Sequence, residues 1–530
     1  MSIFVMTRKD KNKYYYPFKD NMKKESFLLG SFKDNMKKES FLLGSFVAFS
    51  IFAGVLILGF DIVSNIGTTS FLLQKQAFGS ENQHQSTPFP GMNFSKPQDV
   101  WSKNGVLETT ISADYQVGEI DNKTVTSMLY NGSLPGPTFH VYPGDRVEID
   151  LINNLNEPTN IHFHGLHVSP ANNSDNVFLE VAPGETQHYT LNIPKDHPLG
   201  TDWYHSHVHG LSYGQVSAGM SGLFIVEGLE KLLPEPLQNI TTQTFAMRDF
   251  PFDILYSTTH NMSHTSTGHE RLTVNGEVNP EVNIKSGETQ LWRLANIGSE
   301  NSVAVGLPGH KFHVIAEDGY PVWKVRYNNT LLLASGVRYD VLVTGTGNGS
   351  IPLSAVNGGD ERPGTVIATV NVQGNQKDAK PVNIIPTTLR TFSSEQKDLS
   401  NATIAAHRVL DWSSNDRAWV YTINNKTFDA NRVDYTVKLG TVEEWKLINL
   451  DTVESGNVHP FHIHTNHFQV ISVNGKPYDA RGLQDTVIIP TGGEVVIRIP
   501  FNDFVGKTVF HCHLMFHGDF GMMGTFEVVK

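Results

Sequence analysis

Alternation of apolar and polar residues is the dominant pattern in the main body of the chain. Residues 141–153 read VYPGDRVEIDLIN, residues 284–296 read IKSGETQLWRLAN and residues 437–449 read VKLGTVEEWKLIN. Each segment has a glycine at its fourth position, followed by the period-two alternation that predicts a half-buried β-strand. The segments begin 143 and 153 residues apart, so the sequence predicts three similar domains.

A second pattern recurs later in each predicted domain, as VAPGETQHYTL, LASGVRYDVLV and IPTGGEVVIRI. These segments occupy residues 181–191, 333–343 and 489–499. Turn signals also precede each first segment, at Asn131, Asn275 and Asn424. Short alternating strands with Gly and Pro turns are typical of β-sandwiches. We therefore expect an all-β protein with sandwich domains at residues 106–233, 237–375 and 387–530.

The first part of the chain follows a different pattern. FKDNMKKESFLLGS at residues 18–31 is repeated without change at residues 32–45. Residues 40–60 contain no charge and are long enough to span a bilayer. We expect a basic cytoplasmic leader at residues 1–39, a transmembrane helix or signal at 40–60 and a polar tether at 61–105.

This arrangement predicts where the protein resides. Lysines before the apolar segment predict a cytoplasmic N-terminus. The body would then lie outside the cytoplasm, held to the cell membrane by a single span, or would be secreted if the leader is cleaved.

Charge and cysteine content narrow the possible functions. The net charge is −12, and residues 1–39 carry ten Lys/Arg and five Asp/Glu, so the remainder carries −17. An acidic main body argues against nucleic acid as a partner. A single cysteine excludes an intrachain disulfide.

That cysteine, Cys512, stands among potential metal ligands. Its neighbours include His511, His513, His517 and Met522. A thiolate, two imidazoles and a distant thioether are the ligands of a blue-copper electron-transfer site, and His459 is the candidate for the second imidazole. Neighbouring strand residues point to opposite faces. Cys512 is therefore expected to face one metal site while the histidines on either side of it face another.

Four His-x-His pairs that share no residue stand out in the chain. They are His162/His164, His205/His207, His462/His464 and His511/His513. Two pairs fall in the first predicted domain, two in the third and none in the second. Eight imidazoles from two domains can enclose a metal cluster at the domain interface. Structural zinc normally uses four ligands in one closed site, so the adjoining blue-copper set favours copper.

In these motifs the chain resembles the multicopper oxidases, the family of laccases and bacterial cuprous oxidases. HxHG, HxH, HPxHxH and HCHxxxHxxxxM appear in the family's order over residues 106–530. The resemblance implies three cupredoxin-like Greek-key domains that bind four copper ions. It implies a type 1 copper held by His459, Cys512, His517 and Met522. It implies a type 2 copper held by His162 and His462, and a type 3 pair held by His164, His205, His207, His464, His511 and His513.

The resemblance also implies an activity. A phenol, an aromatic amine or a metal ion would give single electrons to the type 1 copper, and the trinuclear cluster would reduce O2 to water. Proton delivery needs a nearby carboxyl group. Asp175 resembles an aspartate of the family, and Asp519 follows Gly518, where several bacterial relatives have Glu; a solvated loop charge is the alternative for both. Three-domain relatives are commonly monomers.

Two other functions stay open at this point. Copper nitrite reductases share the sandwich domains, but they carry the type 1 cysteine in the first domain, where this chain has Ser206 between two histidines. A non-enzymatic copper-binding or structural protein of this fold would lose ligands, whereas this chain keeps all ten histidines and Met522.

Overall fold

The computed structural model describes residues 97–121, 123–251, 270–374, 385–390, 398–452, 457–480 and 482–530. The predicted leader and transmembrane helix lie outside these residues. Among the helices in the described ranges, none has the length and apolar character needed to cross a bilayer. The last part of the predicted tether is folded, because β1 (Asp99–Trp101) pairs in parallel with β4 (Gly136–Val141).

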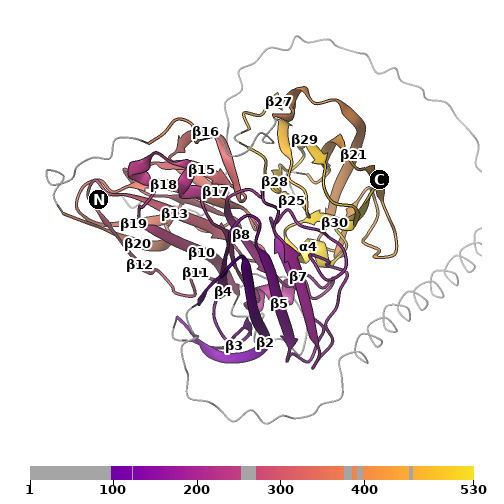
Figure 1. Ribbon diagram of the computed structural model, residues 1–530, viewed down its shortest axis with the longest axis horizontal. Helices are drawn as coiled ribbons and strands as arrows, with labels where there is room; N and C mark the ends of the chain where they lie inside the picture. The colour runs from indigo at the N-terminus through magenta and orange to yellow at the C-terminus, as the bar shows by residue number, and fades with distance from the viewer. Residues whose placement is uncertain are drawn as a thin grey trace, which may run out of the picture. The chain divides into compact units, whose positions relative to one another are not determined.

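The first domain is a sandwich of two sheets (Figure 1). One sheet has the order β3-β2-β5-β7, formed by β2 (Val106–Ile120), β3 (Lys123–Tyr130), β5 (Arg146–Asn153) and β7 (Thr186–Asn192). The other has the order β1-β4-β9-β8-β6, completed by β6 (His162–His164), β8 (Gly200–His205) and β9 (Ser221–Val226). Short helices follow as α2 (Ser212–Ala218), η1 (Leu229–Leu232) and η2 (Glu235–Leu237).

The second domain repeats this architecture. Its first sheet, β11-β10-β13-β18-β15-β16, comprises β10 (Thr242–Pro251), β11 (Glu270–Val274), β13 (Thr289–Asn296), β15 (Phe312–Glu317), β16 (Tyr320–Asn328) and β18 (Arg338–Thr344). Its second sheet, β12-β20-β19-β14-β17, comprises β12 (Glu281–Lys285), β14 (Val303–Gly306), β17 (Thr330–Leu333), β19 (Gly349–Ala355) and β20 (Val366–Gln373).

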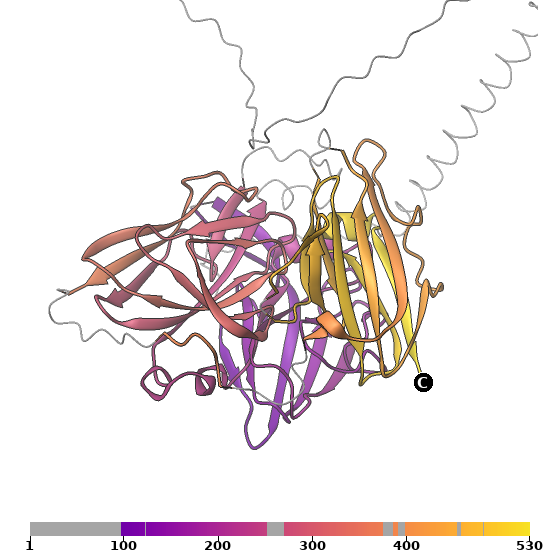
Figure 2. The ribbon, with the colours of Figure 1, turned by 90° about the horizontal axis from the view of Figure 1, so that it is seen from above.

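The third domain repeats it again, and Figure 2 shows its orange and yellow strands as two layers. The sheet β22-β21-β24-β29-β26-β27 comprises β21 (Ile404–Asn415), β22 (Val420–Ile423), β24 (Thr441–Asn449), β26 (Gln469–Val473), β27 (Lys476–Pro477) and β29 (Glu494–Phe501). The sheet β23-β31-β30-β25-β28 comprises β23 (Tyr435–Lys438), β25 (His459–Ile463), β28 (Thr486–Ile489), β30 (Gly506–Cys512) and β31 (Met523–Val529). Helices η3 (Leu399–Asn401) and α4 (Met515–Asp519) complete it.

The two sequence patterns become equivalent neighbouring strands in every domain. The first pattern forms β5, β13 and β24, and the second forms β7, β18 and β29. Each first strand pairs antiparallel with its second strand and parallel with the strand that opens its domain. The expectation of an all-β protein built from three sandwiches is thus confirmed.

In each domain, an asparagine side chain joins the end of the first patterned strand to the start of the second pattern. The residues are Asn153, Asn296 and Asn449, each at the end of the first patterned strand. Their side-chain Nδ2 groups donate to the carbonyls of Val181, Leu333 and Ile489, at 2.8, 3.0 and 3.3 Å. These carbonyls begin the second pattern, so one buried amide fixes the spacing between the two patterns.

A small apolar cluster joins all three domains. Trp203 of β8, Ile297 after β13 and Met515 of α4 are buried in it together. The Trp203 ring also lies against the rings of His164 and His205, at centroid distances of 4.9 and 4.3 Å. Apolar packing therefore reaches the edge of the histidine cluster.

A buried histidine of the first domain gives a pH prediction. His197 Nε2 accepts the backbone N–H of His167 at 2.9 Å, and its Nδ1 donates to the Pro198 carbonyl at 2.8 Å. Burial lowers the pKa of His197 to about 4, although the Pro198 carbonyl partly opposes this. The unfolded chain therefore binds a proton that the folded chain excludes. Stability should fall as the pH drops from about 6.5 to about 4, by up to about 3 kcal/mol for this group.

His197→Gln keeps an acceptor for the His167 N–H but does not titrate. Thermal unfolding of the metal-free protein between pH 7 and pH 4 should show a smaller loss of stability in this variant than in the parent. Identical pH dependence in the two proteins would contradict the assignment.

Candidate metal centre

The cysteine forms a triangle of donor atoms with two histidines of the third domain. Cys512 ends β30, His459 begins β25 and His517 lies in α4. Cys512 Sγ is 3.6 Å from Nδ1 of each histidine, and the two Nδ1 atoms are 3.3 Å apart. Metal–nitrogen and metal–thiolate bonds of about 2.0 and 2.3 Å at trigonal angles place donors about 3.5–3.7 Å apart. The triangle has the size that one ion requires.

Surrounding groups hold the three donors in place. His459 Nε2 lies 3.0 Å from Asp451 Oδ2, and the Tyr421 ring stacks on His517 with centroids 4.3 Å apart. Met522, the predicted axial ligand, is fully buried. Its carbonyl accepts the Cys512 N–H and its N–H donates to the His517 carbonyl, so its backbone ties the two ligands together.

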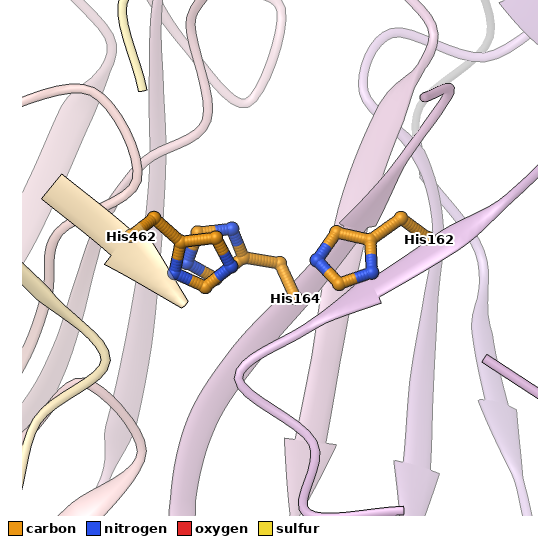
Figure 3. Close-up of side chains that lie close together, drawn as sticks. All are labelled: His162, His164 and His462. Atoms are coloured by element: carbon orange, nitrogen blue, oxygen red, sulfur yellow. The ribbon is translucent and has the colours of Figure 1, made fainter. Parts of the chain in front are cut away.

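The eight remaining predicted histidine ligands form one buried cluster between the first and third domains. Pairing of β6 with β8 sets His162 opposite His205, and pairing of β25 with β30 sets His462 opposite His511. The donor atoms fall into the sets His162/His164/His462, His164/His205/His513 and His207/His464/His511. Figure 3 shows the rings of His164 and His462 overlapping, with His162 beside them. The last two sets contain the six residues predicted for the type 3 pair.

Oxygen acceptors fix the protonation of several rings. The Nδ1 atoms of His205, His462 and His511 lie 2.8–2.9 Å from the carbonyls of Ser206, Asp485 and Cys512. A carbonyl only accepts, so these nitrogens carry the proton and each Nε2 keeps a free lone pair. Nε2 of His162, His205 and His462 has no partner within the described part of the chain. Unpaired lone pairs aimed into a dry cluster fit a metal ion.

Ring nitrogens of three histidines also face one another at close range. His511 Nε2 lies 3.1 Å from Nε2 of both His207 and His464. Burial lowers the pKa of all three rings well below the usual value, and the neighbouring histidines add to this. Neutral imidazole is the form that binds copper, so the residues present fit a copper cluster.

Asp175, one of the two candidates for proton delivery, lies beside this cluster. Its Oδ1 is 2.9 Å from His162 Nδ1 and accepts the Phe163 N–H at 2.9 Å. Burial raises the pKa of Asp175 to about 8, although the Phe163 N–H lowers it in part. In the metal-free protein this carboxyl therefore holds a proton near neutral pH.

Asp519, the second carboxyl candidate, has different contacts. It accepts the backbone N–H groups of Gly210 and Tyr213, at 2.9 and 2.7 Å. These groups lie at the start of α2, so Asp519 ties α4 of the third domain to the first domain. Burial raises its pKa to about 7, opposed by these N–H groups.

Two further carboxylates contact predicted ligands but were not predicted from the sequence. Asp485 accepts from His164 Nε2, with the atoms 3.1 Å apart, and Asp451 supports His459 as described. Both aspartates lie outside the His motifs in the sequence. The pairing of β25 with β28 brings Asp485 close to the histidine cluster, and the turn after β24 brings Asp451 close to His459. Their one sequence signal is that each is an acidic residue close to the end of a strand.

The fold and the donor sets define a protein of β-sandwich domains whose His and Cys clusters are consistent with copper sites. Profiles described as Multicopper oxidase match residues 113–231, 195–375 and 401–530. Multicopper oxidase mco of Staphylococcus haemolyticus is 30% identical over 469 residues, which cover 86% of this chain and 95% of that protein. The chain belongs to the multicopper oxidase family.

Solved structures agree with this assignment. The multicopper oxidase of Campylobacter jejuni, a metallo-oxidase, has a TM-score of 0.68 and 25% identity, covering 83% of this chain and 96% of that one. A laccase of Pediococcus acidilactici shares the fold, with a TM-score of 0.70, 24% identity and coverage of 84% and 95%. The predicted family and oxidoreductase activity are confirmed.

The contact between Asp451 and His459 gives a test of ligand support. Loss of a carboxylate that orients a metal-binding imidazole typically weakens metal binding about 10–100-fold. Asp451→Ala should weaken copper binding at Cys512 by this factor, measured by titrating the blue thiolate–copper absorption. Asp434→Ala is the matched control, since Asp434 of the same domain binds Arg432 and Thr525 instead of a histidine. Equal affinity in the two variants would contradict the role of Asp451.

Proposed function

We propose that the chain binds four copper ions, one at Cys512 and three in the eight-histidine cluster, and couples oxidation of a small substrate to reduction of O2. One observation carries the proposal. Cys512 belongs to one donor set, while His511 and His513 on either side of it belong to two others. Copper would supply one-electron transfer at Cys512 and the four-electron reduction of O2 in the cluster.

The protein's own residues provide the path between the sites. Cys512 is bonded through the backbone to both neighbouring histidines, and β25, which carries His459 and His462, pairs with β30, the strand that ends at Cys512. This rigid pairing keeps the two sites at a fixed separation. Electrons would therefore travel through a few covalent bonds.

Reducing substrates would approach the His517 side of the first site. Trp419 is 38% exposed there and packs against Phe516 and Phe520. The exposed Asp416 accepts from the hydroxyl of Tyr421, whose ring stacks on His517. An aromatic surface suits a phenol or an aromatic amine, and a carboxylate suits a metal ion. Relatives include a bilirubin oxidase of Albifimbria verrucaria and an iron transport multicopper oxidase of Saccharomyces cerevisiae, each 26% identical.

The proposal extends to the setting of the enzyme. Residues 40–60 are uncharged and follow a basic leader, which favours a single membrane anchor with the catalytic body outside the cytoplasm. We propose that the body acts there as a monomer.

The first experiment is the visible and EPR spectrum of the copper-loaded protein, with O2 uptake followed on a phenol, on Fe(II) and on Cu(I). We expect about four copper ions per chain, an intense blue band that Cys512→Ser abolishes, and O2 consumption with at least one substrate. A copper-loaded protein without the blue band, or without O2 uptake on any substrate, would contradict the proposal.

Asp175 gives a separate prediction about proton supply. A positioned acid typically contributes about 10²–10⁴-fold to a rate, so Asp175→Asn should slow O2 reduction by that factor. Anaerobic bleaching of the blue band by substrate should keep its rate, because that step needs no proton at the cluster. The same measurements on Asp519→Asn test the second candidate. Loss of both rates in Asp175→Asn would point to a structural role instead.

A further inference from the structure

The second domain contributes none of the predicted copper ligands, yet one of its loops reaches the histidine cluster. Residues 335–338 read Ser-Gly-Val-Arg and run from the loop after β17 to the first residue of β18; they are called the loop here. We propose that this loop positions two of the three histidines in the set His164/His205/His513, and so determines whether that copper site forms. The inference rests on the trinuclear copper site proposed above.

Ser335 sets the protonation of His513. The Ser335 hydroxyl lies 2.7 Å from the Gly298 carbonyl and 3.0 Å from His513 Nδ1. Because the carbonyl can only accept, the hydroxyl donates to it and accepts from His513 Nδ1–H. His513 Nε2 is then left as a lone pair, held 3.1 Å from His164 Nδ1.

Arg338 sets the protonation of His164 through Asp485. Arg338 Nη1 donates to Asp485 Oδ1 at 2.9 Å, and Nη2 lies 2.8 Å from Oδ2. Asp485 Oδ1 in turn lies 3.1 Å from His164 Nε2. An ionised carboxylate only accepts, so Nε2 carries the proton and Nδ1 faces His513 as a lone pair.

Gly336 gives the loop room between the same two rings. Its φ is +89°, and a Cβ there would lie 3.1 Å from His164 Cε1 and from His513 Nε2. Gly165 of the first domain, the glycine of the HxHG motif, leaves space for Arg338 in the same way. A Cβ on Gly165 would overlap Arg338 Nη2. Only glycine fits at both positions, so the motif of one domain is shaped around the arginine of another.

These contacts place the proton of each ring on its far nitrogen. The two facing nitrogens, His164 Nδ1 and His513 Nε2, are therefore both unprotonated. Neither can donate to the other at 3.1 Å, so a cation is the partner that satisfies both. Without the loop either ring could turn over or change tautomer and share a proton instead. Ser335 and Arg338 are therefore positioning residues.

Arg293 offers a matched control in the same domain interface. It is as deeply buried and bridges Asp340 of its own domain to Glu227 of the first domain, at 3.2 and 3.1 Å. It makes no contact with a histidine among its described partners. A general weakening of the interface should appear in both arginine variants, whereas a defect in the copper site should appear only in the Arg338 variant.

The test compares Ser335→Ala, Arg338→Lys and Arg293→Lys in the copper-loaded protein. Copper content, the blue band, the near-ultraviolet band of the coupled copper pair and the EPR spectrum would be recorded, with the unfolding temperature of each metal-free protein. Ser335→Ala and Arg338→Lys should bind the cluster copper at least about tenfold more weakly. They should lose the near-ultraviolet band and gain an EPR signal from the unpaired ion, while the blue band persists. Arg293→Lys should keep all signals of the parent.

Coupled-pair signals in Ser335→Ala and Arg338→Lys equal to those of Arg293→Lys would overturn the inference. Absence of these signals from the parent itself would instead overturn the proposed function. Ser335→Ala removes one oxygen atom and leaves no charge unpaired, so it keeps the test decisive even where Arg338→Lys does not fold.

Discussion

Burial of the imidazole rings of the ten predicted histidine ligands is the constraint on which this structure depends. A buried ring stays neutral, because desolvation makes its charged form costly, and a neutral ring must place its single N–H on an acceptor. The backbone carbonyls of the next residue along the chain accept from His205 and His511. Each acceptor that holds an N–H also aims the opposite lone pair inward. The geometry of a metal site thus follows from ordinary rules for satisfying buried polar groups.

Copper ions would bring positive charge into this dry region, and the fold provides carboxylates against them. Asp175 and Asp451 each contact one predicted ligand, and Asp485 contacts His164 through its side chain and His462 through its carbonyl. Burial alone would raise the pKa of Asp485, but Arg338 and His164 outweigh burial and hold that pKa well below its usual range. Asp485 therefore stays ionised without copper, whereas Asp175 takes up a proton. Two carboxyls in the same region differ because only one has an arginine.

The repeated scaffold and the ligand motifs could be predicted from the sequence, because both depend on the spacing of residues that are close along the chain. Alternation with turn signals located β5, β13 and β24, and the His-x-His spacing placed pairs of rings on one strand face. Spacing along the chain could not show that Ser335 or Asp485 reaches a ring, since strand pairing across domains brings them there. The same limit explains β1, read as tether although it adds to a sheet. It also explains why the contact of Asp519 with α2 of the first domain was not predicted.

Asn153, Asn296 and Asn449 each close one sandwich. Within the described part of the chain their side chains bond to backbone groups, and none of those groups belongs to a predicted copper ligand. The same amide lock in all three domains points to descent from one ancestral unit by duplication. It also separates assembly of the chain from metallation. A polypeptide whose scaffold closes through its own amides can complete its fold first and bind copper afterwards.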